Sequence, residues 1–224
     1  MERKIKILYE DGDLLVCVKP CGMPSQPDLT GNPDLLTYLS GECPEIMLVH
    51  RLDTATGGVM VYAKNKFAAG KLCALVQDHN AFVKEYLAVT ENPPLPKDGE
   101  MTDILFHDKM VNKSYVVEKE RAGCKAARLE YRTLSVADDG HALVSVRLFT
   151  GRTHQIRVQF ASRGYSLCGD KKYGSHERFE CGLALWSYRI SFPHPRKKKI
   201  IECTALPPEV TPWTFFDCDE FTKK

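Results

Sequence analysis

Residues 47–62, MLVHRLDTATGGVMVY, decide how the chain is organised around a candidate site. Two apolar runs flank three ionisable residues, His50, Arg51 and Asp53, and a Thr/Gly segment follows the carboxylate. Short apolar runs are typical of buried strands, and functional groups commonly lie on loops that leave a sheet. The stretch therefore predicts a loop that presents Asp53 beside a sheet core. A structural alternative stays open, because Asp side chains and glycines also form ordinary turns and bulges.

Outward from this stretch, alternating apolar and polar residues predict a series of short strands. These cover residues 5–9, 14–18, 59–63, 82–89, 114–117, 127–134, 142–149, 184–192 and 199–203. Capping residues and helical periodicity predict helices over 34–40, 65–77 and 153–163, and the Pro/Gly-rich segment 92–99 is interpreted as a turn region. The expected fold is α+β, with a large, mainly antiparallel mixed sheet and a few flanking helices.

A second constellation lies in residues 149–160, FTGRTHQIRVQF. Helical spacing puts Arg157 beside Phe160 and Ala161, so its guanidinium is flanked by apolar neighbours. A charge so placed needs a carboxylate or phosphate to satisfy its donors, and Asp53 is the best-placed acid. The alternative is a buried ion pair with no catalytic duty.

Four polar residues, Arg152, Thr153, His154 and Gln155, come at the predicted start of that helix, with Thr153 as its cap. Free N–H groups and the positive end of a helix dipole favour an anion there, so a phosphate would suit the position. A polar helix entry exposed to water is the alternative for Thr153 and Gln155.

A third element is residues 82–89, FVKEYLAV, where a period of two places Lys84 and Tyr86 on one face. A tyrosine beside a lysine could stack on a nucleic-acid base, although such residues also serve in cross-strand packing.

The charge balance is nearly even, since 31 Lys and Arg against 29 Asp and Glu give a formal charge of +2 on 224 residues. A gross polycation is thereby excluded, and 43% hydrophobic residues exclude a disordered chain. Basic residues nevertheless gather in 186–200, which contains no acid and includes the run 196–199. With its interleaved aromatics, this segment suits a nucleic-acid groove; a solvated surface hairpin is the alternative.

Nine cysteines without a C-x-x-C pair predict reduced thiols and a cytoplasmic protein. No metal site is expected, because even Cys17 and Cys21 lack a second pair at ligand spacing. Neither a secretory signal nor an apolar run of the ~20 residues needed to span a membrane is present in the sequence.

Together these residues resemble the RluA-type family of RNA pseudouridine synthases. Residues 50–58, HRLDTATGG, look like its aspartate motif, 84–88, KEYLA, like its tyrosine motif, and 151–158, GRTHQIRV, like its arginine motif. Residues 18–23 and 169–174 are supporting matches. The sequence departs from the family at Gly57, where Ser is usual, and at Trp186-Ser187, where relatives often have Leu-His-Ala. The resemblance begins near the start of the sequence, so we expect a catalytic domain without the small RNA-binding domain that many relatives carry.

The resemblance implies a pseudouridine-synthase-like catalytic domain that isomerises specific uridines in ribosomal or transfer RNA without a cofactor. Asp53 would be the nucleophile or catalytic carboxylate, and Arg157 would pair with it and keep it ionised. Tyr86 would stack on the base, and Arg51 would fill the gap left by the flipped uridine. The expected RNA-binding residues are Arg51, His50, Lys84, Arg152, Thr153, His154 and Gln155.

The expected organisation is a single catalytic domain over residues 1–224, with its core at about 7–205 and an acidic tail at about 208–224. RNA is the expected partner of a monomer, with no membrane and no obligate protein partner. Two rival functions remain, a non-catalytic RNA-binding protein and a hydrolase built on Asp53 with His50 or His154.

Overall fold

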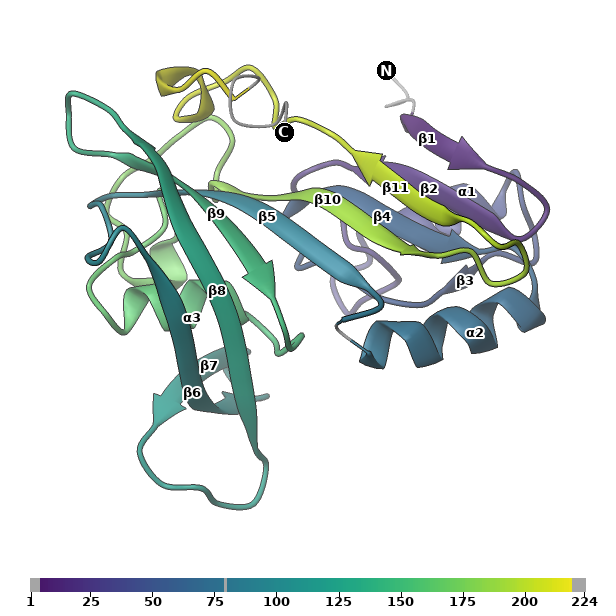
Figure 1. Cartoon of the computed structure of the whole chain (residues 1–224), viewed down its shortest axis with the longest axis horizontal. Coiled ribbons are helices and arrows are strands. Elements are labelled where there is room, and N and C mark those ends of the chain that lie inside the picture. Colours follow the sequence, from purple (N-terminus) through teal and green to yellow (C-terminus); the bar gives the residue numbers. More distant parts are fainter. Residues whose placement is uncertain (1–4, 79, 219–224) are drawn as a thin grey trace. The chain divides into compact units, whose positions relative to one another are not determined.

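The computed structural model describes residues 5–78 and 80–218 (Figure 1). Contacts group the chain into two compact units, the first formed by Met1–Lys84 and Trp186–Leu206 and the second by Glu85–Leu185 and Pro207–Lys224. The single catalytic domain stays a prediction, and the last six residues of the acidic tail lie outside the described residues. None of the helices in the described parts is both long and apolar enough to cross a membrane.

The first unit contains a mixed set of strands and two helices (Figure 1). The elements are β1 (Ile7–Glu10), β2 (Leu14–Lys19), α1 (Leu35–Ser40), β3 (Met47–Leu48), β4 (Gly57–Ala63), α2 (Lys66–Gln77), β10 (Leu185–Pro193) and β11 (Ile200–Thr204). Antiparallel pairs join β1 to β2, β2 to β4, β3 to β4 and β10 to β11. The pair β4 and β10 is parallel, which makes the sheet mixed.

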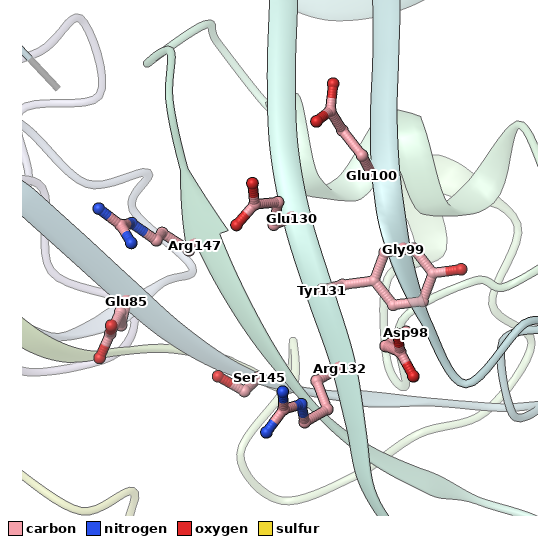
Figure 2. A pocket seen from close by; sticks show the side chains of 9 residues that line it. All are labelled: Glu85, Asp98, Gly99, Glu100, Glu130, Tyr131, Arg132, Ser145 and Arg147. Carbon is pink, nitrogen blue, oxygen red and sulfur yellow. The ribbon is translucent and has the colours of Figure 1, made fainter. Parts of the chain in front are cut away.

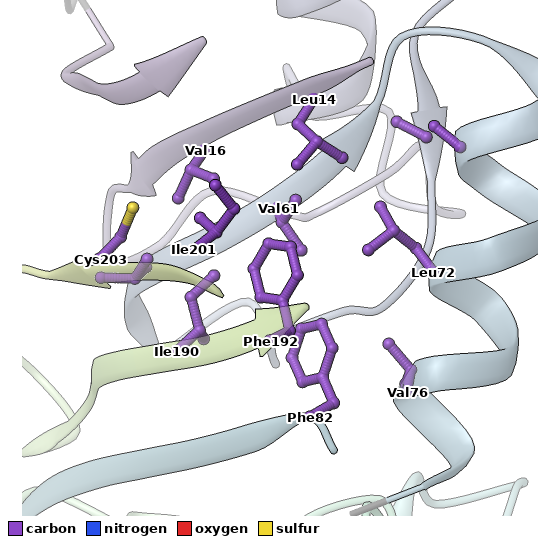
Figure 3. Close-up of a cluster of buried hydrophobic side chains, with 13 residues drawn as sticks. Leu14, Val16, Val61, Leu72, Val76, Phe82, Ile190, Phe192, Ile201 and Cys203 are labelled. Atoms are coloured by element: carbon purple, nitrogen blue, oxygen red, sulfur yellow. The ribbon is translucent and has the colours of Figure 1, made fainter. Parts of the chain in front are cut away.

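The core of this unit forms where α2 packs on the strands (Figure 3). Asn65 caps the helix by accepting a hydrogen bond from Ala68 N at 2.9 Å, as the sequence predicts. Leu72 on the buried stripe of α2 is fully buried in the cluster that includes Phe82 and Phe192, whose rings stack at 4.9 Å. Each such buried side chain contributes roughly 1.5–3 kcal/mol relative to exposure, so this cluster supplies a rigid support for the loops.

The second unit has five strands joined in antiparallel pairs. They are β5 (Val83–Thr90), β6 (Asp98–Asp108), β7 (Lys113–Val117), β8 (Cys124–Val136) and β9 (Ala142–Leu148), with helix α3 (Gln155–Ala161). The order within the unit is β5, β9, β8, β6, β7. Val158 of α3 packs in a buried cluster with Leu105 of β6, Ala127 of β8 and Tyr173.

The predicted fold class, a mainly antiparallel mixed sheet with few helices, is confirmed. Two elements differ from the sequence-based expectation. Strand β6 begins at Asp98, inside the segment interpreted as a turn. Only Met101 and Leu105 of this strand are buried. Because most of its residues are polar, its sequence does not show the alternation that predicts a strand. Helix α3 begins at Gln155, because His154 adopts a left-handed φ of 55°, and Thr153 is therefore not its cap.

Candidate active site

The loop that carries Asp53 lies between β3 and β4 of the first unit and closes with a turn. Thr56 N donates to the carbonyl oxygen of Asp53 at 3.0 Å. Leu52 is buried, Asp53 is half-buried and Arg51 is exposed. The hydroxyl of Ser25 donates to Leu52 O at 2.9 Å and accepts from Leu52 N at 3.1 Å, so both main-chain groups before Asp53 are held.

Lys19 is a second support of this loop. Its side chain is completely buried, and Nζ donates to three main-chain carbonyls, those of Pro20, Met23 and Thr54, at 3.0, 2.6 and 3.2 Å. Burial lowers the pKa of Lys19 to about 8, although the charges of Cys21 and Asp53 act in the opposite direction. The Lys19 ammonium thus holds Thr54, the residue that follows Asp53. The sequence analysis did not predict this role. Its only signal was that Lys19 lies within residues 18–23, which match the family.

His50 lies at the start of the same loop and is oriented by the backbone. Its Nε2 accepts a hydrogen bond from Val61 N at 3.1 Å, and its ring packs 5.7 Å from that of Phe82. Burial, followed by the charge of Lys84, lowers the pKa of His50 to about 3. The imidazole is therefore neutral near pH 7, and its Nε2 lone pair is already used.

The two departures from the family pattern, Gly57 and Trp186, are in contact. A Cβ on Gly57 would lie 2.4 Å from Cζ3 of Trp186 and 2.7 Å from Sγ of Cys21. The next residue, Gly58, has a φ of +116°, and a Cβ there would lie 2.2 Å from Ser187 O. The indole thus occupies the space that a serine side chain at position 57 would need.

Lys84 and Tyr86 both lie on β5 and both are buried. The Lys84 ammonium is 5.9 Å from the centre of the Phe82 ring, and burial lowers the pKa of Lys84 to about 8. Tyr86 pairs in register with Val146 of β9 in the second unit. Keeping the charged ammonium of Lys84 buried therefore costs free energy. Such residues are typical of sites that bind an anionic or carbonyl-bearing ligand.

Arg157 is buried on α3 and forms a two-pronged ion pair. Its Nε and Nη2 donate to Asp170 at 2.7 and 2.8 Å, with exposed side-chain fractions of 9% and 1% for the two residues. The guanidinium also lies over the Tyr173 ring, 5.1 Å from its centre. The need for an acid from elsewhere in the fold is confirmed, and the acid that the structure identifies is Asp170. A pair with Asp53 stays a prediction.

The remaining polar residues of this motif hold the turn before α3. Gln155 accepts from Thr150 Oγ1 at 2.7 Å and from Arg152 N at 3.1 Å, and donates to Arg128 O at 3.1 Å. His154 Nδ1 lies 3.0 Å from the hydroxyl of Tyr173.

Arg152 and Thr153 belong to the same turn. Arg152 Nε donates to Ala126 O at 2.8 Å, and Thr153 O accepts from Ser114 Oγ at 2.7 Å. The structure therefore gives these residues internal partners where the sequence suggested an open helix entry, while their contact with RNA stays a prediction.

The basic run 196–199 is compensated by acids from the β1–β2 turn. Arg196 pairs with Asp13 at 3.0 Å, and Lys197 pairs with Asp11. Lys199 donates to the Tyr9 hydroxyl at 2.9 Å. Residues 186–200 contain no acid themselves, but folding brings Asp11 and Asp13 from another segment next to their basic residues.

A cavity of about 520 Å³ lies over β5, β6, β8 and β9 of the second unit (Figure 2). Charged side chains line it, among them Glu85, Glu130 and Arg147, and no residue predicted for catalysis does. Successive residues of a strand point to opposite faces, so Glu85 and Tyr86 lie on opposite sides of the sheet. The cavity is therefore separate from the face that carries Tyr86.

Comparisons with known proteins agree on one family. A family profile described as RNA pseudouridylate synthase matches residues 13–162. The uncharacterised RNA pseudouridine synthase YlyB of Bacillus subtilis is 33% identical over 218 residues, covering 92% of this chain and 70% of the relative. The dual-specificity RNA pseudouridine synthase RluA of Salmonella typhimurium is 33% identical over 193 residues, covering 84% of this chain and 87% of the relative.

Among solved structures, human RNA pseudouridylate synthase domain containing 4 matches with a TM-score of 0.71 at 27% identity, covering 91% of this chain and 88% of that one. The range matched by the family profile includes Asp53, Tyr86 and Arg157, and the mixed fold agrees with the structural match. The chain belongs to the RluA-type RNA pseudouridine synthases, the enzymes that isomerise uridine in RNA to pseudouridine.

Proposed function

We propose that this enzyme acts on specific uridines of ribosomal or transfer RNA, with Asp53 as its nucleophile or catalytic carboxylate. Two relatives carry the names ribosomal large subunit pseudouridine synthase D and dual-specificity RNA pseudouridine synthase, and both kinds of substrate are therefore considered. The cytoplasm is the proposed location, where the nine free thiols would stay reduced.

The observation that carries the assignment of Asp53 is the rigidity of its loop. Ser25 binds both main-chain groups of Leu52, and Lys19 binds the carbonyl of Thr54. The residues on either side of Asp53 are thus fixed through their backbones. A nucleophile must be held close to its attack geometry, and preorganisation of this kind supplies much of an enzyme's rate enhancement.

The other roles follow from the family resemblance and residue chemistry. Arg157 pairs with Asp53 and favours its ionised form, since an opposite charge at short range lowers a carboxylate pKa. Tyr86 stacks on the detached base, and Arg51, whose side chain is exposed two residues before the carboxylate, occupies the gap left by the flipped uridine.

The rival hydrolase is disfavoured by His50. A general base needs a free lone pair, and Nε2 of His50 accepts a backbone hydrogen bond while burial keeps the ring neutral. His154, the other histidine considered, is buried and in contact with Tyr173. Neither ring therefore offers an available base beside a water.

The test is release of tritium from RNA labelled at carbon 5 of uridine. We expect Asp53→Asn to abolish release while RNA binding survives, and Asp28→Asn, an exposed acid in a local turn, to leave turnover unchanged. Appreciable turnover by Asp53→Asn would contradict the role of the carboxylate. Mapping pseudouridines in ribosomal and transfer RNA from cells that lack the enzyme would identify the substrate.

A further inference from the structure

A cluster of potential metal ligands lies in the second unit, apart from every residue assigned above. Ligand atoms of His141, Cys168 and Glu177 all lie within 4.8 Å of one another. Nε2 of His141 is 3.0 Å from Glu177 Oε2, and the Cys168 sulfur lies within 4.8 Å of both residues' ligand atoms. His141 is distant in the sequence from Cys168 and Glu177, so the sequence pattern did not predict the cluster.

A carboxylate lies beside the histidine of the cluster. Nδ1 of His141 is 2.9 Å from Asp139 Oδ1, an ion-pair contact without hydrogen-bond geometry, so within the described residues Nδ1 is a buried atom that has no hydrogen bond. Histidines that bind metal through one ring nitrogen commonly present the other to a carboxylate. The rings of Phe179 and Phe215 lie 6.0 and 5.5 Å from the imidazole and restrict access of water.

The thiol of Cys168 is buried near two carboxylates. Burial, followed by the charges of Glu177 and Glu91, raises the pKa of this thiol. Within residues 5–78 and 80–218, His141, Cys168 and Glu177 form no ion pair with a lysine or arginine. A buried oxygen of Glu91, Oε1, has no hydrogen-bond partner in this described part either. The partner of Glu177 and Asp139 is the imidazole of His141, and a divalent cation would take the place of its proton between these groups.

We propose that His141, Cys168 and Glu177 bind a zinc-class divalent ion, with the Asp139 carboxylate beside the other ring nitrogen of the histidine. Sulfur, imidazole nitrogen and carboxylate oxygen are the ligands that Zn²⁺ takes, at about 2.3 Å for sulfur and about 2.0–2.2 Å for nitrogen and oxygen. On binding, the thiol proton and the proton on Nε2 leave to solvent, and Nδ1–H donates to Asp139. No change of redox state is involved.

A second cluster in the first unit has similar residues but different surroundings. Ligand atoms of Asp11, Asp13 and His194 also lie within 4.8 Å of one another. Arg196 and Lys197 already pair with the two carboxylates, and the cluster has no sulfur. It therefore serves as an internal control that should not bind a soft divalent ion tightly.

The ion would stabilise the turn that holds Arg157. Asp170, which pairs with Arg157, and Tyr173, which lies against it, fall between Cys168 and Glu177 in the sequence. Two ligands on either side of this turn would close it into a loop. We expect zinc to raise the thermal midpoint of the full chain, and chelation to lower it.

The experiment is a titration of chelator-treated, reduced full-length protein with Co²⁺ and then Zn²⁺. We expect one equivalent of Co²⁺ to produce a sulfur-to-cobalt charge-transfer band and visible bands of tetrahedral intensity, and Zn²⁺ to remove them. Cys168→Ser should abolish the charge-transfer band, whereas Cys203→Ser, a buried thiol in the first unit, and Asp11→Asn should leave it unchanged.

Two further variants alter partly exposed side chains, so they test metal binding with little effect on folding. Glu177→Gln alters a side chain that is 39% exposed, and Asp139→Asn one that is 51% exposed. Each should weaken Zn²⁺ affinity, the second by roughly 10–100-fold as outer carboxylates do. Absence of the charge-transfer band in the unmodified protein, or its persistence in Cys168→Ser, would overturn the proposal.

Discussion

The two units hold their candidate catalytic residues by different physical means. In the first, the segment around Asp53 is fixed through main-chain groups, which bind the Ser25 hydroxyl and the Lys19 ammonium. In the second, Arg157 is fixed through its own charged group, which binds Asp170 and lies over Tyr173. When a loop is held by hydrogen bonds to its main chain, its charged side chain stays available for chemistry. When a residue is held by an ion pair of its own side chain, its position depends on the partner of that ion pair.

This difference predicts different sensitivities. Loss of a partner from a buried ion pair leaves an uncompensated charge, which costs several times more than the loss of a neutral hydrogen bond. Variants in the second unit should therefore act mainly on stability. Variants around Asp53 should act on loop geometry and activity with smaller effects on folding.

The largest stability effect is expected from Asp170→Asn. It removes the charge that compensates the buried Arg157, so we expect a loss of about 3–5 kcal/mol in the free energy of unfolding. Urea denaturation measures it. Glu202→Gln, which breaks the more exposed pair with Arg189, is the matched control and should cost at most about 1 kcal/mol. If both variants lost the same free energy of unfolding, the buried ion pair would contribute no more to stability than the exposed one, which would contradict this prediction.

The second-largest effect is expected at Lys84, where a substitution should increase the free energy of unfolding. The pKa of Lys84 is lowered to about 8 by burial, so its charged form is disfavoured in the folded state. The unfolded chain binds more protons between about pH 8 and the ordinary lysine pKa of about 10.4, and this residue therefore makes stability rise with pH in that window.

At pH 7 the full penalty applies, and we expect Lys84→Met to stabilise the fold by up to about 3 kcal/mol while impairing activity. Urea denaturation at pH 7 and pH 10 checks both points, because the gain should shrink at the higher pH. Lys66→Met, at an exposed position at the start of α2, is the control and should change neither value. A destabilised Lys84→Met protein would show that the ammonium is favourably bound.

A double-mutant cycle tests the packing next to the Asp53 loop. Gly57→Ser should cost about 1–3 kcal/mol, because the added side chain meets the indole of Trp186. Trp186→Leu should also destabilise, by leaving a cavity. The double variant should recover part of both losses, with a coupling of about 0.5–3 kcal/mol measured by thermal or urea unfolding. Strict additivity would mean that the two family departures are unrelated.

The smallest effect is expected at the basic run 196–199. Arg196→Gln with Lys197→Gln removes two exposed cations that pair with Asp13 and Asp11, so the free energy of unfolding should change little, because solvent screens such pairs. The salt dependence of RNA binding should fall by less than the roughly 0.7–0.9 per phosphate contact that a free cation would contribute. A fall of the full amount for both residues would place RNA directly on this run.

Much of the local structure follows from spacing along the chain. The cap at Asn65 and the apolar stripe of α2 depend on neighbours within four residues, and α2 is found as predicted. Strand β6 was missed because its own residues are largely polar, which conceals the alternation of buried and exposed positions. The start of α3 was misplaced because a left-handed His154 is maintained by tertiary contact with Tyr173, which no local pattern encodes.

The sequence alone determined the family, the mixed antiparallel fold class and the three motifs, because these depend on residue type and order. Tertiary structure decided which charges meet. It gave Arg157 the carboxylate of Asp170, gave the basic run the acids of Asp11 and Asp13, and brought His141, Cys168 and Glu177 together. The physical reason is that electrostatic and coordinating interactions act over a few ångströms in space, and that proximity arises only when distant segments pack.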